Sequence, residues 1–325
     1  MTSSSARFRS ILVPLDGSPL AEQAIPMALA IAERARSKVK LVLVHHPLLM
    51  EPGPEHIKIE LAMQKADREY LRSVAARLRE RLGRALSSAV LRGPIAQTLA
   101  RYIRELSTDL VVMTTHGRGG VRRAWLGSVA DQLIRTSEVP ILVVRPREGK
   151  AAESSVDLAE MLVPLDGSPL AEAVLEPAAA LARLWDGEMS LVQVVRPIVL
   201  DSDPVLPFPI GYSDQATAMR RESAHDYIRD VAERLRESGV KASGVAVIGG
   251  GIADTLLNLA RPERVSLVAV ATHGRGGLRR LTLGSVADKL VRAAEVPVLI
   301  VRPAARRSRR SSEESNVSVS ARTAG

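Results

Sequence analysis

Short aliphatic runs alternate with longer amphipathic stretches along the first half of the chain. The runs are four to six residues long and rich in leucine or β-branched residues, which is typical of strands buried on both faces of a parallel sheet. They cover residues 11–15, 39–44, 86–91, 110–113 and 141–144. Between them, apolar residues recur at helical spacing opposite Arg and Glu in residues 19–35, 57–81 and 95–106. This order predicts a doubly wound α/β fold with right-handed crossovers.

Two segments of the sequence occur twice, in the same order. Residues 161–172 repeat residues 11–22 at eleven of twelve positions, and residues 272–303 repeat residues 115–146 at 23 of 32. A period of roughly 150 residues is the size of a complete domain, so we expect two duplicated domains with separate sites. The expected division is a first domain at 1–146, a linker at 147–160, a second domain at 161–303 and a disordered, basic, Ser-rich tail at 304–325. The spacing between copies grows from 150 to 157 residues, and we expect the added residues in a proline-rich loop at 197–213.

The composition limits the class of protein. With 325 residues, of which 46% are hydrophobic and 2% aromatic, the chain can bury two aliphatic cores. The absence of cysteine excludes disulfides, thiolate metal sites and cysteine nucleophiles. No apolar segment reaches the roughly 18 residues that span a bilayer, and no signal-peptide core is evident. We therefore expect a soluble, cytoplasmic protein without a membrane partner.

The net charge of +9 does not by itself indicate a nucleic-acid partner. Part of the charge lies in the arginines of the C-terminal tail. Another part lies in the glycine-rich segment present in both copies, where the first copy holds Arg118, Arg122 and Arg123. These arginines can face the phosphates of a small ligand as readily as those of a polymer. The aromatic residues on which single-stranded nucleic acids stack are scarce, so nucleic acid ranks low among the expected partners.

Both repeated segments lead to the same place in the predicted fold. In an open parallel sheet, ligands bind beyond the carboxyl ends of the strands, where the winding changes direction. Asp16 follows the first strand and residues 114–120 follow the fourth. Gly127-Ser128 then begins a helix whose unpaired amides and positive dipole end suit a phosphate group. Glycine lets an anion approach without a Cβ clash, and Asp16 can hold a ribose hydroxyl or a phosphate-bound metal ion.

The same residues resemble the universal stress protein family, and the resemblance covers almost all of both halves. Nucleotide-binding members carry Gly, two residues, Gly, nine residues, and then Gly-Ser or Gly-Thr. Gly117 followed by Gly127-Ser128 fits the later part of this pattern, and the second half repeats it. The leading glycine of the pattern is replaced by Thr114 in the first half and by Ala271 in the second.

The resemblance implies two five-stranded parallel sheets with strand order 3-2-1-4-5, each binding ATP or a related adenine nucleotide. It implies that Asp16 and Asp166 lie near the ribose or a nucleotide-bound Mg²⁺, and that the backbone around His45 and Val195 lies against the adenine. The expected nucleotide-binding residues are Pro14, Asp16, His45, Thr114, Gly117, Arg118, Gly119, Gly120, Gly127, Ser128 and Val129 in the first half, and Pro164, Asp166, Val195, Ala271, Gly274, Arg275, Gly276, Gly277, Gly284, Ser285 and Val286 in the second.

The sequence offers little catalytic machinery. It lacks a Gly-x-x-x-x-Gly-Lys-Ser/Thr loop and a Gly-x-Ser-x-Gly elbow. Histidines beside glycine loops, such as His116 and His273, are more often structural than catalytic. His45 and His46 lack the spaced partners of a metal site, and we predict neither a catalytic residue nor a metal site made by protein alone. A binding and regulatory protein is the leading interpretation; a weak ATP hydrolase and a ligand-free scaffold, which Thr114 and Ala271 favour, are the alternatives. Asp16 and Asp166 can also serve only to cap the turn into the following helix.

The last strands of the two domains, within residues 140–145 and 297–302, fall at sheet edges in this strand order. Long hydrophobic edges must be covered or paired. Dimers of the family pair this strand across a two-fold axis, so we expect the two domains to form an internal pseudo-dimer through these edges. A further homodimer is an open alternative.

Overall fold

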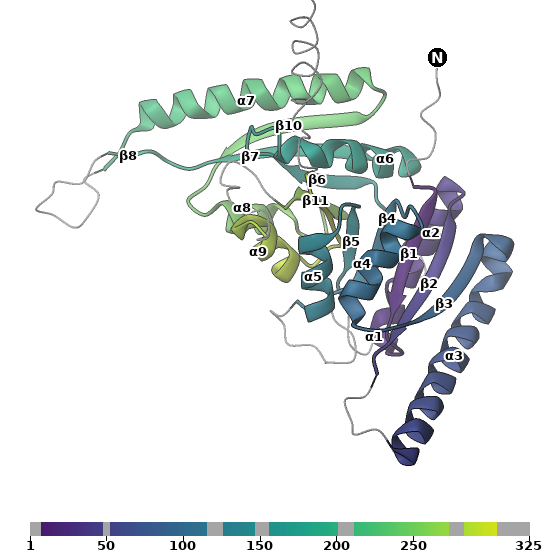
Figure 1. Cartoon of the computed structure of the whole chain (residues 1–325). Coiled ribbons are helices and arrows are strands. Elements are labelled where there is room, and N and C mark those ends of the chain that lie inside the picture. The colour runs from purple at the N-terminus through teal and green to yellow at the C-terminus, as the bar shows by residue number, and fades with distance from the viewer. Residues whose placement is uncertain are drawn as a thin grey trace, which may run out of the picture.

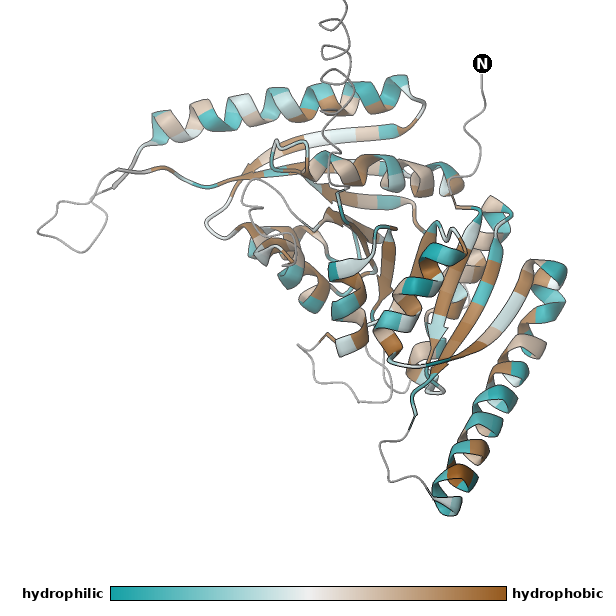
Figure 2. Cartoon of the chain, viewed as in Figure 1, coloured by the Kyte–Doolittle hydropathy of each residue, from teal (hydrophilic) through white to brown (hydrophobic). Residues whose placement is uncertain are grey.

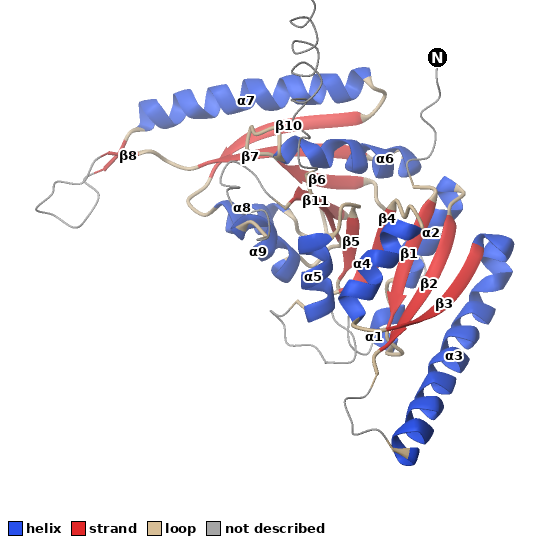
Figure 3. Ribbon diagram, in the orientation of Figure 1, coloured by secondary structure: helices blue, strands red, loops and turns tan. Residues whose placement is uncertain are grey.

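Most of the strands join into one sheet in the computed structural model of the chain, which describes residues 8–47, 53–115, 126–146, 156–200, 211–272 and 283–303. Ten strands lie in the order β10-β7-β6-β11-β12-β5-β4-β1-β2-β3 (Figure 1; Figure 3). Their bounds are β1 Ser10–Leu15, β2 Lys38–His45, β3 Leu86–Arg92, β4 Leu110–Thr114, β5 Ile141–Val144, β6 Glu160–Pro164, β7 Glu188–Val195, β10 Lys241–Ile248, β11 Leu267–Ala271 and β12 Val298–Val301. Each half is parallel with order 3-2-1-4-5, as predicted.

Helices cover both faces of this sheet. One face carries α1 Pro19–Glu22, α2 Ile25–Ala35, α3 Pro54–Leu82, η2 Ala171–Val174, α6 Leu175–Trp185 and α7 Asp214–Glu237. The other carries α4 Ile95–Glu105, α5 Ser128–Thr136, α8 Ile252–Leu259 and α9 Ser285–Ala293. Side chains alternate between the two cores along each strand: Ile11 and Val13 join the first core, and Leu12 joins the second. Figure 2 shows the apolar residues gathered on the strands and hydrophilic ones along α3 and α7.

One expected helix is interrupted. The apolar spacing predicts a continuous helix over residues 19–35, but the structure has α1 and α2 separated at Gln23 and Ala24. Pro26 explains the break, because it has no N–H to donate to the carbonyl four residues earlier and its ring crowds that carbonyl. Ser18 caps α1, its Oγ accepting a hydrogen bond from the Ala21 amide at 3.2 Å.

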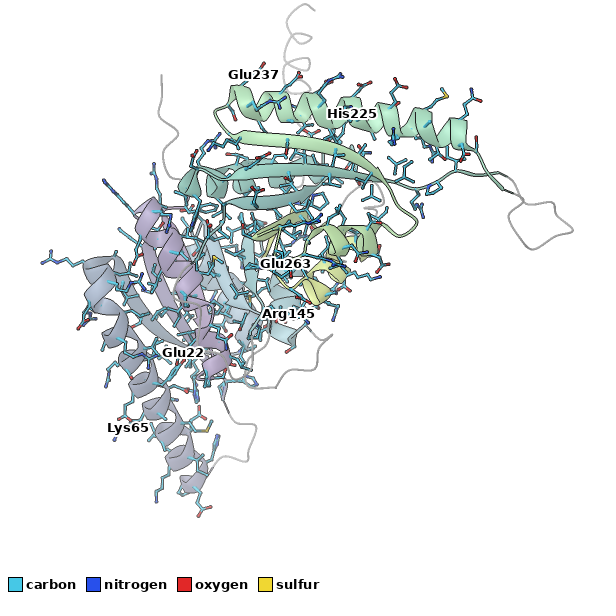
Figure 4. The ribbon with its side chains drawn as sticks, turned by 180° about the vertical axis from the view of Figure 1, so that it is seen from behind. Glu22, Lys65, Arg145, His225, Glu237 and Glu263 are labelled. Atoms are coloured by element: carbon cyan, nitrogen blue, oxygen red, sulfur yellow. The ribbon has the colours of Figure 1, made fainter. Side chains whose placement is uncertain are left out.

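The two halves meet through the edge strands β5 and β12, which pair antiparallel. Leu142 and Leu299 stand opposite each other in this pairing, and both are fully buried. The predicted edge pairing between domains is therefore confirmed, and the sheet continues from one half into the other. Arg145, labelled in Figure 4, crosses the junction and donates to the Ala294 carbonyl at 3.1 Å.

One contact and one charge interaction link helices across this junction. On one face, the Arg34 guanidinium of α2 lies 4.3 Å from the ring centre of Trp185, at the end of α6. On the other, Arg135 of α5 donates to Asp131 at 2.7 and 2.9 Å. The hydrogen bond that Arg135 donates to Asp131 raises the pKa of Arg135, and the charge of Asp288 in α9 adds to the rise. The helices α5 and α9 therefore lie close enough for their charges to interact.

The insertion in the second half lies where the sequence spacing predicts it. Residues 197–213, expected to form a loop, include the two-stranded ribbon β8 Val199–Leu200 and β9 Gly211–Tyr212 between β7 and α7. The predicted loop is thus partly regular structure. Among the described residues, no helix combines the length and apolarity needed to cross a membrane.

Candidate functional site

The aspartate after the first strand of each half fixes a turn. Asp16 Oδ1 accepts hydrogen bonds from the Ser18 amide at 2.9 Å and from Ser18 Oγ at 2.7 Å. Gly17 between them has φ of 85°, in the left-handed region that favours glycine. The second half repeats the turn, with Asp166 Oδ1 2.9 Å from the Ser168 amide. Each aspartate therefore forms the turn into the next helix, at the carboxyl end of the central strand.

The glycine before α5 and α9 joins the fourth strand to the start of the helix. The Gly127 amide donates to the Thr115 carbonyl at 2.8 Å, and Gly284 makes the same bond to Thr272. A Cβ atom on Gly284 would lie 2.9 Å from that carbonyl oxygen, so a larger residue would force the backbone apart. Gly127 and Gly284 occupy the N-cap positions, where no side chain accepts a hydrogen bond from the first-turn amides. These amides also have no partner within the helix. Ser128, the first helical residue, is exposed.

The topology brings these two features to one edge of the sheet in each half. β1 pairs with β4 in parallel, so Asp16, which follows β1, and Thr114, which ends β4, lie on the same side of the sheet. The winding also reverses there: α1 and α2 follow β1 on one face, whereas α5 follows β4 on the other. Asp16 and Gly127-Ser128 therefore flank the switch point, the usual ligand site of such sheets.

The remaining predicted residues are placed as follows. Thr114 and Ala271 are buried at the ends of β4 and β11, and Pro14 and Pro164 are half-buried in the central strands. Val129 and Val286 pack partly against the second core. The predicted positions Gly117, Arg118, Gly119, Gly120, Gly274, Arg275, Gly276 and Gly277 lie outside the described residues.

A buried polar network surrounds His45 at the end of β2. Its Nδ1 lies 2.7 Å from Asp67 Oδ2, and its Nε2 lies 3.0 Å from Glu60 Oε1. Arg92, at the end of β3, donates to the same Glu60 oxygen at 3.1 Å. His45 and Glu60 are 3% and 7% exposed, so both ionisable groups lie inside the protein. Sequence spacing did not reveal these partners, because Glu60 and Asp67 come from α3 and are charged residues in a mostly solvent-facing helix.

In the second half, the corresponding position at the end of β7 is lined by apolar side chains and one hydroxyl group. Val195 ends β7 and packs with Ala224 and Ala246 in a small separate cluster. The buried Thr217 Oγ1 accepts a hydrogen bond from the Ile198 amide at 2.9 Å. The two halves therefore differ beside the strand end against which the adenine is expected.

A second polar contact is shared by both halves. Tyr70 of α3 donates to Glu22 of α1 at 3.0 Å, and Arg77 forms an ion pair with the same carboxylate (Figure 4 labels Glu22). In the second half Tyr227 donates to Glu172 at 2.9 Å. Burial raises the pKa of Tyr70 above its ordinary value, and the charges of Glu22 and Asp16 raise it further. The pKa of Tyr227 rises for the corresponding reasons, with burial again the largest.

Comparison with known proteins identifies the family. A model described as the universal stress protein family matches the chain twice, over residues 7–145 and 159–302. The chain belongs to the universal stress protein family. The universal stress protein Rv1996 of Mycobacterium tuberculosis is 29% identical over 313 residues, which cover 90% of this chain and 94% of that protein. The universal stress protein YxiE of Bacillus subtilis is 31% identical over 146 residues, which cover 44% of this chain and 98% of YxiE.

Solved structures of universal stress proteins share the fold. One from Archaeoglobus fulgidus superimposes with a TM-score of 0.62 at 16% identity, covering 90% of this chain and 96% of that chain. YxiE matches less than half of this chain over nearly its whole length. YxiE therefore corresponds in length to about one half of this chain, and the family model matches each half separately.

Proposed function

We propose that this universal stress protein binds ATP, or a related adenine nucleotide, in each half and acts in the cytoplasm as a stress-response regulator. The observation that carries the proposal is duplicated geometry. In both halves an aspartate turn and a glycine-capped helix start flank the switch point of the sheet. The duplicated Gly-x9-Gly-Ser spacing, which resembles that of nucleotide-binding members, supports the same assignment.

The phosphates are assigned to the N-termini of α5 and α9. The amides of the first helical turn point toward the ligand and the helix dipole favours negative charge. Ser128 and Ser285 are exposed at the first helical position and can donate their hydroxyls. Asp16 and Asp166 are assigned to the ribose or to Mg²⁺ held by the phosphates, and Arg118 and Arg275 to the phosphates.

Binding and regulation account for these residues better than catalysis does. The phosphate segments contain neither a lysine nor the Walker-type loop that phosphate-transferring enzymes use. The alternative of a ligand-free scaffold draws on Thr114 and Ala271, which stand where nucleotide-binding members carry glycine.

The test is calorimetric titration with MgATP of Ser128→Asp and Ser285→Asp, each compared with the uncharged Ser→Asn control. Aspartate in the first turn stabilises a helix by about 0.3–1 kcal/mol, so the folded protein should be unharmed. Beside phosphates the same charge should repel, and we expect at least about tenfold weaker binding, or about 1.4 kcal/mol, at the altered site. Equal affinities for the Asp and Asn variants would contradict phosphate binding at the helix start.

The role of the aspartates is tested by Asp16→Asn and Asp166→Asn. Asparagine preserves the turn, because its side-chain oxygen accepts the same hydrogen bonds, but it removes the charge. We expect unchanged thermal unfolding and weaker, less Mg²⁺-dependent ATP binding. Sustained release of ADP by wild type that disappears in these variants would instead favour the weak hydrolase.

A further inference from the structure

The His45 network is present in the first half alone among the described residues, and it lies beside the expected base. We infer that His45, Glu60, Asp67 and Arg92 clamp the N-terminal part of α3 to the ends of β2 and β3, so that the first site is preorganised and binds adenine nucleotide more tightly than the second. The inference rests on the proposed function and adds which site is the stronger and which residues make it so.

The backbone at this place is the same in both halves, so side chains carry the difference. The His45 carbonyl accepts from the Gly93 amide at 3.1 Å, and the Val195 carbonyl accepts from the Gly249 amide at 3.0 Å. His45 stands in register with Arg92 of β3, and Val195 stands in register with Ile248 of β10. Arg92 and Ile248 are therefore equivalent positions.

The long helices align through the contact that both halves share. Tyr70 and Arg77 contact Glu22, and Tyr227 and Arg234 contact Glu172. Both helical residues are thus displaced by 157 positions between the halves. With the same displacement, Glu60 corresponds to Thr217 and Asp67 to Ala224.

The network links buried side chains to an exposed one: the side chains of His45, Glu60 and Asp67 are 3%, 9% and 15% exposed, whereas that of Arg92 is 63% exposed. Both ring nitrogens of His45 lie within hydrogen-bond distance of a carboxylate, Nδ1 of Asp67 and Nε2 of Glu60, and Arg92 donates to the same Glu60 oxygen. Glu60 and Asp67 lie seven residues apart on α3, so the ring connects positions about two helical turns apart. Hydrogen bonds between charged groups are about twice as strong as neutral ones.

The second half has a weaker connection at this place. The Thr217 side chain accepts one hydrogen bond, from the Ile198 amide in the loop that follows β7. Val195, Ala224 and Ala246 make only apolar contacts in a cluster separate from the main cores. The beginning of α7 is therefore attached to a loop, whereas the beginning of α3 is attached to two strands.

The first test is amide hydrogen exchange on the intact chain without nucleotide. We expect amides in residues 60–67 of α3 to exchange at least about tenfold more slowly than those in residues 217–224 of α7, since about 1.4 kcal/mol changes an opening equilibrium tenfold. In the quadruple variant His45→Val/Glu60→Thr/Asp67→Ala/Arg92→Ile, which installs side chains that the second half already accommodates, the α3 amides should exchange like those of α7. Equal exchange in wild type, or no change in the variant, would overturn the clamp.

The second test measures each site with the other blocked. Ser285→Asp leaves the first site to be titrated with MgATP, and Ser128→Asp leaves the second. The quadruple variant should weaken the first site about tenfold and leave the second unchanged, whereas Val195→His/Thr217→Glu/Ala224→Asp/Ile248→Arg should strengthen the second. Unchanged affinities overturn the link between clamp and binding. If wild type binds ATP at neither site, the proposed function and this link both fail, and exchange alone decides the clamp.

Discussion

The two halves of this chain share the same backbone fold but differ in the buried side chains at the end of the second strand, β2 in the first half and β7 in the second. Both have the aspartate turn, the glycine-capped helix and the Glu–Tyr contact between the first and long helices. Beside the second strand, however, the first half buries His45 between two carboxylates, and the second half buries Val195 against alanines. Replacing a buried ionic network by apolar residues is often neutral or stabilising. The comparison teaches that the fold does not require the charges, so their presence in one half points to a local role.

The largest expected effect on stability concerns the junction at which β5 and β12 join the two halves into one sheet. Leu142→Lys and Leu299→Lys each place a charge in a fully buried, directly opposed pair. We expect each to lower the free energy of unfolding by about 4 kcal/mol or more, because a large apolar side chain is lost and a charge is buried. Denaturant unfolding measures it, with Leu→Met as the volume-conserving control. Unchanged unfolding and hydrodynamic radius would show that the halves do not depend on this pairing.

The next largest effect on stability concerns the His45 network, which the second half replaces by the apolar cluster around Val195. His45→Val leaves Glu60 and Asp67, whose side chains are 9% and 15% exposed, without the ring between them. Breaking a buried ionic network in this way costs about 3–5 kcal/mol. The triple variant His45→Val/Glu60→Thr/Asp67→Ala removes all three groups and should unfold within about 1 kcal/mol of wild type. A triple variant less stable than the single one would show that the charges do not act as a unit.

A smaller and equal effect is expected where the halves agree. Tyr70→Phe and Tyr227→Phe each remove one hydrogen bond and should cost about 1 kcal/mol at neutral pH. The raised tyrosine pKa adds stability that is fully present below the unfolded value, about 10, and is lost as the pH rises through the folded value. Each Phe variant should therefore show a shallower loss of stability above this pH. Unequal effects of the two variants would contradict the equivalence of the two contacts.

The smallest effect concerns the contact between α2 and α6. Arg34→Ala removes the guanidinium that lies over the Trp185 ring. Such contacts contribute about 0.5–1 kcal/mol at exposed sites, so the midpoint of thermal unfolding should fall slightly. Arg34→Lys should retain part of the contact energy and lower the midpoint less. A loss as large as that at the β5–β12 junction would mean that the helices rather than the strands hold the halves together.

Local patterns in the sequence predict most of the fold. The aliphatic runs predict the five strands of the first half, and the repeat predicts a second parallel unit of the same kind that pairs with the first through the last strands. The break before α2 was missed because apolar spacing continues through it, although Pro26 carries the signal. Helix periodicity reports which residues are apolar and is insensitive to the loss of a single backbone hydrogen bond.

The candidate site was predictable where it is made of repeated residues. Asp16 and Gly127-Ser128 stand out because they recur, and the order of strands places them at one edge. The network around His45 could not be found in this way, since its residues occur in one half and come from three elements distant in sequence. Comparing the halves shows that Thr217 and Ala224 replace Glu60 and Asp67. This replacement becomes visible only after the structure has aligned α3 with α7.

The most direct measurement of the central claim is calorimetric titration of the intact wild-type chain with MgATP. Two duplicated sites that differ at His45 and Val195 predict two binding events per chain with unequal affinities, the tighter one lost in Ser128→Asp and the weaker one lost in Ser285→Asp. Absence of heat and of any bound nucleotide at millimolar ATP, in a protein whose unfolding transition is intact, would contradict it.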